Sequence, residues 1–381
     1  MGAKQSVAVG LEIAGNRGTA ALIDRHGRIL HRIYAKTLWG RPAAATLEPY
    51  LRAIDALLDY AHAEGFHIGG LGACIPGSVD QASRRPALIP TLPSLNGFPL
   101  CDLLETRYRL PAQLHVDVDA ALLGEHRFGA GKGFRRLLFL TVNAVVGAAL
   151  VIDGKIERSA QQYVGHVCHV SVATNGPRCS CGERGCINTY VSMDAMQKMV
   201  QRALRRGEQT SLTQRLINRE FFSPQLLAEE AVRGDSVALQ VFSEVGRWLG
   251  AAVARYISIF EPNMLILGGG VLGASELLVP QLRSALVSHS SSQMCTMIEV
   301  VPARLGNDAA LIGSVVSLLS GNLPQGALQS VPVADVAYDL VHKENSDHQP
   351  QVEYDTDEIA IPADVVSQRA QSRKSHQSQR R

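Results

Sequence analysis

Apolar residues between positions 6 and 320 recur with two periods, one typical of strands and one typical of helices. The stretch 46–62 places Leu47, Ile54 and Leu57 on one face at helical spacing, and Gly65 marks its end. A second long helix is predicted over 237–256. Short apolar runs bounded by turn residues predict strands at 7–16, 19–30 (broken by a turn at Gly27), 69–77, 113–116, 137–153 and 263–271. Strands and helices are therefore mixed along this part of the chain.

Proline and glycine positions limit several of these elements. Prolines within 88–97 remove backbone donors and predict a loop without helix, followed by a short helix over 99–108. Ser223 before Pro224 predicts an N-cap and the first position of a helix. The segment 306–313 opens the last predicted helix, which we expect to end near Ser320.

Composition narrows the class of protein. With 381 residues and 46% hydrophobic content, the chain is long enough for a large core, which we expect in two lobes. A formal net charge of +2 argues against a broad nucleic-acid interface. No apolar run reaches the length of a membrane span, and no charged-then-apolar leader opens the sequence. The scattered cysteines outside one cluster suit a reducing cytoplasm. Residues 321–381 have few large apolar side chains, so we expect a disordered tail.

The strongest chemical signal is one histidine and three cysteines between residues 169 and 186. Cys179, Cys181 and Cys186 follow the spacing C-x-C-x4-C, with glycines between the last two, and His169 precedes them. Tetrahedral Zn²⁺ takes four nitrogen and sulfur ligands of this kind. Four protein ligands leave no position for a substrate water, so we expect a structural zinc. Buried thiols or a redox-active C-x-C pair are the alternatives, and the nearby histidine favours metal.

Three further features each have both a functional and a structural interpretation. Asp117 stands at a predicted helix start, where the helix dipole can keep a carboxylate ionised as a general base. An ordinary N-cap is the alternative, and local sequence alone favours it. The bend near Gly15 and the triple glycine at 268–270 could hold a phosphate or a nucleotide's base or ribose. A plain hairpin and a structural connector are the corresponding alternatives.

Laid end to end, these segments resemble the ROK family (repressor, open reading frame, kinase) from about residue 6 to 320. The cysteine loop carries most of the resemblance, with Cys168-His169 through Cys186 standing for the pattern G-H-x9-C-x-C-G-x-x-G-C. Supporting motifs lie at 70–80, 117–131, 260–271 and 306–313. The resemblance implies an α/β, two-lobed actin-like ATPase (ribonuclease H-like) fold with a structural zinc loop at 169–186. Residues 1–117 and 306–320 would form the N-terminal lobe, and 118–305 the C-terminal lobe.

The family includes ATP-dependent hexose kinases and sugar-responsive repressors, so the resemblance implies roles for individual residues. In the kinases, an Asp at the position of Asp117 takes the proton from a sugar hydroxyl that attacks the γ-phosphate. ATP and Mg²⁺ are implied for activity, and zinc would hold the sugar-contacting loop. The implied sugar-binding residues are Asn96, Asp117, His166, His169 and Asn188. The implied nucleotide-binding residues are Gly15, Asn16, Gly147, Gly268, Gly269 and Gly270.

Several phosphate and sugar motifs depart from the family pattern. The first phosphate turn, Asp-x-Gly-Gly-Thr in the kinases, is Glu-Ile-Ala-Gly-Asn at 12–16. The second, Gly-Thr-Gly-x-Gly, is Asn-Ala-Val-Val-Gly at 143–147, and valine resists the positive φ that glycine supplies. The altered sugar positions are Val116 for Asn, His166 for Glu, Cys168 for Gly and Asn188 for Glu. Each lost hydroxyl-binding partner costs about 1–3 kcal/mol, so these changes predict either reduced turnover or a site refitted for another ligand.

Three hypotheses follow. The first is an ATP-dependent hexose or amino-sugar kinase of altered specificity, supported by Asp117 and the triple glycine. The second is a kinase-derived sugar sensor or regulatory binding protein without turnover, supported by the altered phosphate loops. The third, a DNA-binding repressor, is disfavoured, because the family's repressors carry a winged-helix segment ahead of the lobes and this sequence begins at the first strand. We also expect a homodimer, with the helix over 237–256 as its contact.

Overall fold

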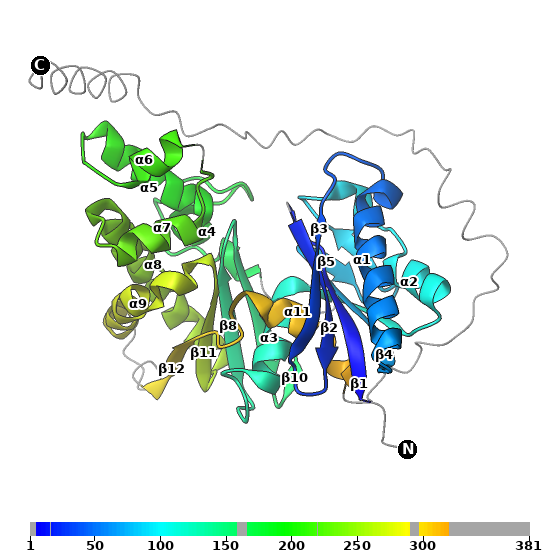
Figure 1. Ribbon diagram of the computed structural model, residues 1–381. Helices are drawn as coiled ribbons and strands as arrows, with labels where there is room; N and C mark the ends of the chain where they lie inside the picture. Colours follow the sequence, from blue (N-terminus) through cyan, green and yellow to red (C-terminus); the bar gives the residue numbers. More distant parts are fainter. Residues whose placement is uncertain (1–4, 16, 158–165, 219, 290–296, 320–381) are drawn as a thin grey trace, which may run out of the picture.

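The computed structural model describes residues 5–15, 17–157, 166–218, 220–289 and 297–319, and it has two lobes, each built on a five-stranded sheet (Figure 1). Two expectations fall outside these residues: Asn16 as a nucleotide ligand, and the disordered tail over 321–381. The side chain of His166 also lies outside the description. Among the described helices, none combines the length and apolar character needed to cross a membrane.

The N-terminal sheet consists of β1 (Ser6–Glu12), β2 (Arg17–Asp24), β3 (Ile29–Lys36), β4 (His67–Ile75) and β7 (Ala112–Val116), in the order β3-β2-β1-β4-β7. Strand β1 is antiparallel to β2, whereas β1, β4 and β7 are parallel to one another. Helices α1 (Ala43–Ala63) and α2 (Leu100–Tyr108) cover one face, where Leu47 and Leu57 are buried. Because β1, β4 and β7 are parallel, their carboxyl ends meet at one edge of the sheet.

The C-terminal sheet consists of β8 (Leu137–Val142), β9 (Val146–Ile152), β10 (Lys155–Ile156), β11 (Met264–Gly269) and β12 (Glu299–Pro302), in the order β10-β9-β8-β11-β12. Strands β8 and β9 form an antiparallel hairpin, and β11 lies parallel between β8 and β12. The short 3-10 helices η2 (His166–His169) and η3 (Gly270–Ala274) adjoin the sheet. The predicted hairpin and the predicted strand that runs into the triple glycine are both confirmed.

A layer of helices covers the outer face of the C-terminal sheet (Figure 1). It contains α4 (Asn188–Val191), α5 (Met193–Arg205), α6 (Leu212–Ile217), α7 (Pro224–Val232), α8 (Ser236–Phe260) and α9 (Ser275–His289). Ser223 caps α7 by accepting the Leu226 N–H, as predicted. Helix α8, the predicted long helix, buries Val245 and Leu249 within its own lobe and exposes Ile259. The homodimer through this helix stays a prediction.

Short helices join the two lobes between their sheets: α3 (Asp117–Phe128), η4 (Gly306–Asp308), α11 (Ala309–Gly313) and α12 (Val316–Leu319). Leu122 of α3 packs on the C-terminal sheet, and Leu311 of α11 packs on the N-terminal sheet. The two helices touch through glycines, since a Cβ added to Gly313 would lie 1.6 Å from the Ala120 carbonyl oxygen. A side chain at Gly313 would therefore separate the helices that connect the lobes.

Two sequence predictions needed correction. The segment 88–97 is not free of helix, because Pro93–Leu95 form a 3-10 helix, η1, with proline at its first turn. A missing N–H costs little at that position, where the donor has no partner within the helix. The last helix is not continuous, since it is divided into η4, α11 and α12. A small hairpin of β5 (Ser78–Asp80) and β6 (Arg85–Leu88) was not predicted as such.

Candidate functional site

Asp117 is the first residue of α3 and directly follows β7. Val116 occupies the N-cap position, so the N-cap interpretation of Asp117 is wrong. Its Oδ1 accepts a hydrogen bond from the Val118 backbone N–H at 2.7 Å. Burial raises the pKa of the Asp117 carboxyl to about 6, the Val118 bond opposes this, and the negative charge of Asp119 adds to it. A carboxylate that titrates near neutrality is suited to accept a proton from a substrate hydroxyl.

A second carboxylate, Glu12, lies at the same edge of the N-terminal sheet, where β1 ends. Burial raises the pKa of Glu12 to about 7; the negative charges of Asp117 and Asp308 act in the same direction, and Arg32 acts against it. Arg32 itself forms a 2.7 Å ion pair with Asp308 of η4. Three acidic groups and one guanidinium therefore interact at the junction of the two lobes.

The four predicted metal ligands converge in space. The ligand atoms of His169, Cys179, Cys181 and Cys186 all lie within 4.8 Å of one another. Cys179 Sγ is 3.5 Å from His169 Nδ1, and Cys181 Sγ is 3.6 Å from Cys186 Sγ. Zinc bonds of about 2.0–2.3 Å in a tetrahedron separate the ligand atoms by about 3.3–3.8 Å. These residues therefore form a group that fits a tetrahedral metal ion.

Glycines and backbone hydrogen bonds shape the loop that carries the metal ligands. Gly185 has a φ of +73°, and a Cβ there would lie 1.7 Å from the Ala173 carbonyl oxygen. The Cys179 N–H donates to the Glu183 carbonyl oxygen at 2.8 Å, which closes the turn around Cys181. Only glycine fits at Gly185, because a side chain would meet both an unfavourable φ and the opposing backbone.

Two predicted sugar ligands use their side-chain oxygens within the fold. Asn188 Oδ1 accepts a hydrogen bond from the Val146 N–H at 3.1 Å, which connects the segment after the metal loop to the start of β9. Asn96 Oδ1 accepts from the Ile89 N–H at 2.7 Å and closes the loop that contains η1. Each of these side-chain oxygens therefore has a structural role within the fold.

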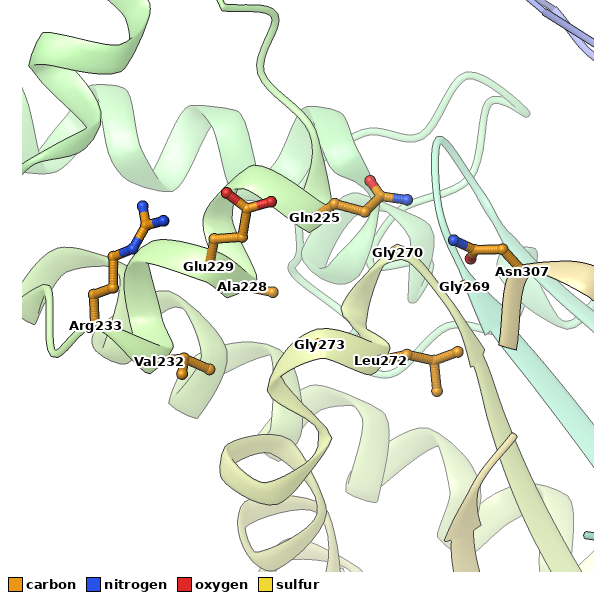
Figure 2. Close-up of a pocket in the computed structure, with 10 residues that line it drawn as sticks. All are labelled: Gln225, Ala228, Glu229, Val232, Arg233, Gly269, Gly270, Leu272, Gly273 and Asn307. Carbon is orange, nitrogen blue, oxygen red and sulfur yellow. The ribbon is translucent and has the colours of Figure 1, made fainter. Parts of the chain in front are cut away.

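The triple glycine borders a pocket of about 470 Å³ (Figure 2). A volume of this order lies within the usual range of small-molecule sites, roughly 300–1,000 Å³. Figure 2 shows Gln225 of α7 reaching toward the glycine turn, with Asn307 on the opposite side. The lining residues are Gln225, Ala228, Glu229, Val232, Arg233, Gly269, Gly270, Leu272, Gly273 and Asn307.

Each of the three glycines also has a structural reason to be glycine. A Cβ would lie 2.5 Å from the Phe139 ring at Gly268, 2.6 Å from the Val142 carbonyl oxygen at Gly269, and 2.7 Å from the Gln225 amide at Gly270. Gly269 further has a φ of +88°. The turn is therefore both a close-packed connector, as the alternative interpretation held, and one wall of a pocket.

The β8–β9 loop, residues 143–145, contacts this glycine turn. Asn143 Oδ1 accepts the Gly270 N–H at 2.7 Å, and Asn143 Nδ2 donates to Thr141 Oγ1 at 3.1 Å. None of the three residues of this described loop has a positive φ. Gly147 lies within β9 opposite Thr141 and not in the loop. The loop therefore has no backbone conformation that requires glycine.

The first predicted phosphate turn lies beside an aromatic ring and a cation. A Cβ added to Gly15 would be 3.1 Å from Cζ2 of Trp39, whose side chain is 47% exposed. The Arg17 guanidinium lies 3.6 Å from the centroid of the Tyr34 ring. Positive charge and aromatic surface therefore adjoin the end of β1.

The structure thus brings the metal ligands together and places the triple glycine beside the hairpin loop. Sequence reasoning did not identify Glu12 and Asn143 as residues of the candidate site, although both lie inside the altered motifs. Their positions at the end of β1 and directly after β8 were the available signal. Gln225 and Asn307 gave no local signal, because they reach the pocket from segments distant in sequence.

Comparisons with known proteins agree with these features. A family model described as "ROK family" matches residues 8–320. The chain is 29% identical over 306 residues to a glucokinase of Thermotoga maritima, covering 80% of this chain and 95% of that protein. It is 26% identical over 300 residues to a xylose repressor of Caldicellulosiruptor bescii, and this match covers 78% of this chain and 74% of that protein. A ROK family glucokinase from Streptomyces griseus, solved in complex with glucose and AMPPNP, matches with a TM-score of 0.68 at 27% identity, covering 81% of this chain and 97% of that one. Because the family model spans most of the sequence, and the fold is the two-lobed arrangement expected of it, this chain belongs to the ROK family.

Proposed function

We propose that the protein binds a hexose or an amino sugar between its lobes and phosphorylates it with ATP, using Asp117 as general base. The observation that carries this proposal is the Asp117 carboxyl at the start of α3, whose pKa burial raises to about 6. The similarity to glucokinases supports the reaction class. The position of Asp117 at the lobe junction supports its role in that reaction.

In the proposed reaction, a sugar hydroxyl oxygen forms a bond to the γ-phosphorus of ATP while the bond to ADP breaks. The hydroxyl proton passes to the Asp117 carboxylate. The bond from the Val118 N–H to Oδ1 holds the carboxylate in orientation, so we assign Oδ2 as the proton acceptor. A positioned base of this kind contributes about 10²–10⁴-fold to the rate.

The nucleotide has a candidate place in the pocket that Gly269 and Gly270 border. When bound, Mg²⁺ neutralises charge on the phosphoryl group that is transferred. Glu12 offers a carboxylate oxygen of the type that Mg²⁺ prefers, and a nearby cation would offset the repulsion from Asp117 and Asp308.

We propose zinc as the ion of the four-ligand group, with a structural role. One imidazole and three thiolates with ligand-atom separations of 3.5 and 3.6 Å fit tetrahedral Zn²⁺ and leave no position for a reacting water. Asn188, two residues after Cys186, binds the backbone of Val146 at the start of β9. The metal group would therefore brace the β8–β9 hairpin as well as its own loop.

A second candidate function is sugar binding without turnover, as in a sensor derived from a kinase. The specific observation in its favour is the second phosphate loop. There the Gly270 N–H is bonded to Asn143, and no residue of 143–145 adopts the left-handed conformation. The similarity to a xylose repressor is consistent with such a role.

An ATP-coupled assay across hexoses and amino sugars distinguishes the two functions, with calorimetry to measure sugar binding. The kinase proposal expects turnover that Asp117→Asn abolishes while sugar binding persists. Asp194→Asn, which changes an exposed carboxylate on α5, serves as the matched control and should keep full activity. Sugar binding without turnover in the unaltered protein would refute the kinase proposal and support the sensor.

A further inference from the structure

Two neutral amide side chains lie on opposite sides of the glycine turn that borders the pocket. Gln225 belongs to the first turn of α7 and Asn307 to η4, and both line the pocket. Figure 2 shows their amide groups pointing toward one another. Within the described part of the chain, neither amide has a hydrogen-bond partner, and both residues are exposed. Each amide can therefore donate to a ligand and accept from it.

The Gln225 amide lies flat against the glycine turn. A Cβ added to Gly270 would be 2.7 Å from Cδ, Oε1 and Nε2 of Gln225 alike. Three amide atoms at the same distance from one point show that the plane of the amide faces that point. A side chain at Gly270 would displace the amide, so the glycine supports its flat face. The edge that carries the donor and the acceptor remains available to a ligand.

The charges of the pocket suit the uncharged parts of a nucleotide. Among the described lining residues, Arg233 is the one cation, and its guanidinium pairs with Glu230. Glu229, the one lining acid among them, pairs with Arg215 at 3.0 Å. Phosphate groups are usually bound by cations that are free to pair with them. The pocket is therefore better suited to a base and a ribose than to a triphosphate.

The position of the pocket gives the direction of the bound nucleotide. Arg233, the C-cap of α7, follows Gln225 by eight residues, which is roughly 12 Å along a helix. At the other end, Asn307 directly precedes Asp308 of the lobe junction. The transferred phosphoryl group has to reach Asp117 at that junction. The phosphates therefore leave the pocket past Asn307, the base lies toward Arg233, and the ribose lies between them, beside the two amides.

We propose that Gln225 and Asn307 bind the two ribose hydroxyls of the nucleotide and make the protein selective for ribonucleotides. Each hydroxyl is neutral and can both donate and accept, which matches a neutral amide. A site that binds a hydroxyl through such groups rejects the analogue that lacks it. The inference rests on the proposed function, since it takes the pocket as the nucleotide site.

A purely structural role for the two amides makes a different prediction. If Gln225 only packed on Gly270, its removal would change the affinities for a ribonucleotide and for its dideoxy analogue alike. If it binds a ribose hydroxyl, removal weakens the ribonucleotide alone. The ratio of the two dissociation constants therefore separates the roles.

The experiment measures the dissociation constants of ADP and of 2′,3′-dideoxy-ADP by calorimetry at fixed Mg²⁺ and ionic strength. The unaltered protein should bind ADP roughly ten- to hundredfold more tightly, the worth of two neutral hydrogen bonds. Gln225→Ala and Asn307→Ala should each weaken ADP roughly three- to tenfold and leave the dideoxy analogue within about twofold. Gln214→Ala is the matched control, because Gln214 is an exposed amide on α6 outside the pocket lining, and it should change neither affinity.

The comparison of the two ligands on the unaltered protein needs no variant, so it tests the inference even if a substitution impairs folding. Equal affinities for ADP and the dideoxy analogue would overturn the inference and leave the proposed kinase function standing. Equal losses for both ligands in Gln225→Ala and Asn307→Ala would overturn it as well. If neither nucleotide binds while sugar does, the ATP-dependent function and this inference fail together.

Discussion

Replacing Glu12 with glutamine should stabilise the protein at pH 8 and leave its stability nearly unchanged at pH 4. Burial, together with the charges of Asp117 and Asp308, raises the pKa of Glu12 from 4.5 to about 7. Folding therefore favours the protonated carboxyl, which glutamine mimics in shape and in neutrality. The stability linked to Glu12 is fully present below pH 4.5 and is lost as the pH rises through about 7.

The size of this change in stability follows from the two pKa values of Glu12. A pKa change from 4.5 to about 7 corresponds to about 3 kcal/mol, and we expect about 2 kcal/mol because the side chain is only partly buried and solvent screens its charge. Urea unfolding at pH 4 and at pH 8 measures it, since the midpoint shifts while the slope stays constant. Glu48→Gln is the matched control, because Glu48 is 57% exposed beside Arg52 and should change stability by less than about 0.5 kcal/mol.

A gain from Glu12→Gln that is equal at both pH values would refute this reasoning, because it would show that charge is not the cause. Loss of stability at pH 8 would also refute the reasoning, because it would mean that the surrounding groups stabilise the ionised carboxylate of Glu12. A gain in stability accompanied by a loss of ATP-dependent activity would mark Glu12 as a residue kept for function at a cost in stability.

The remaining predictions concern the base, the metal and the lobe junction. If Asp117 is the base, kcat/KM should fall as the pH drops through about 6, because its carboxylate becomes protonated; a flat profile between pH 5 and 7.5 would contradict this. Cys186→Ala should remove zinc in elemental analysis and lower the unfolding temperature by several degrees, and unchanged metal content would exclude the four-ligand site. Gly313→Ala should destabilise the protein by about 3 kcal/mol or prevent folding, whereas Gly69→Ala, whose Cβ meets only ordinary contacts, should be tolerated; equal unfolding midpoints would contradict the close helix crossing.

Local sequence was sufficient to predict those features whose interacting residues all lie within one short segment. The metal group was predictable because four ligands and the glycines that turn the chain around them fall within eighteen residues. Helix α1 was predictable from the spacing of Leu47, Ile54 and Leu57, which the structure buries on one face. Ser223 was predictable as a cap because capping involves only the next three residues.

Local sequence was insufficient where a residue's role depends on distant partners. Asp117 is a residue type that commonly caps helices, but Val116 occupies the N-cap position and Asp117 is the first residue of the helix itself. Glu12 acquires its raised pKa from burial and from Asp117 and Asp308, which are remote in the chain. Pro93 starts a 3-10 helix because prolines only exclude helix interiors and not first turns.

In the altered second phosphate loop, the stability of the fold is independent of phosphate binding, and the contacts of the loop give the physical reason. Glycines at such a loop leave backbone donors exposed to a ligand, and they lose more conformational entropy on folding than other residues. In residues 143–145 the chain avoids the left-handed conformation, and Asn143 satisfies the Gly270 donor from within. On the other side, Asn188 satisfies the Val146 donor at the start of β9. The hairpin is therefore complete without a phosphate. Stability of the loop does not depend on a bound nucleotide, so the two lobes can keep their fold whether or not phosphoryl transfer takes place.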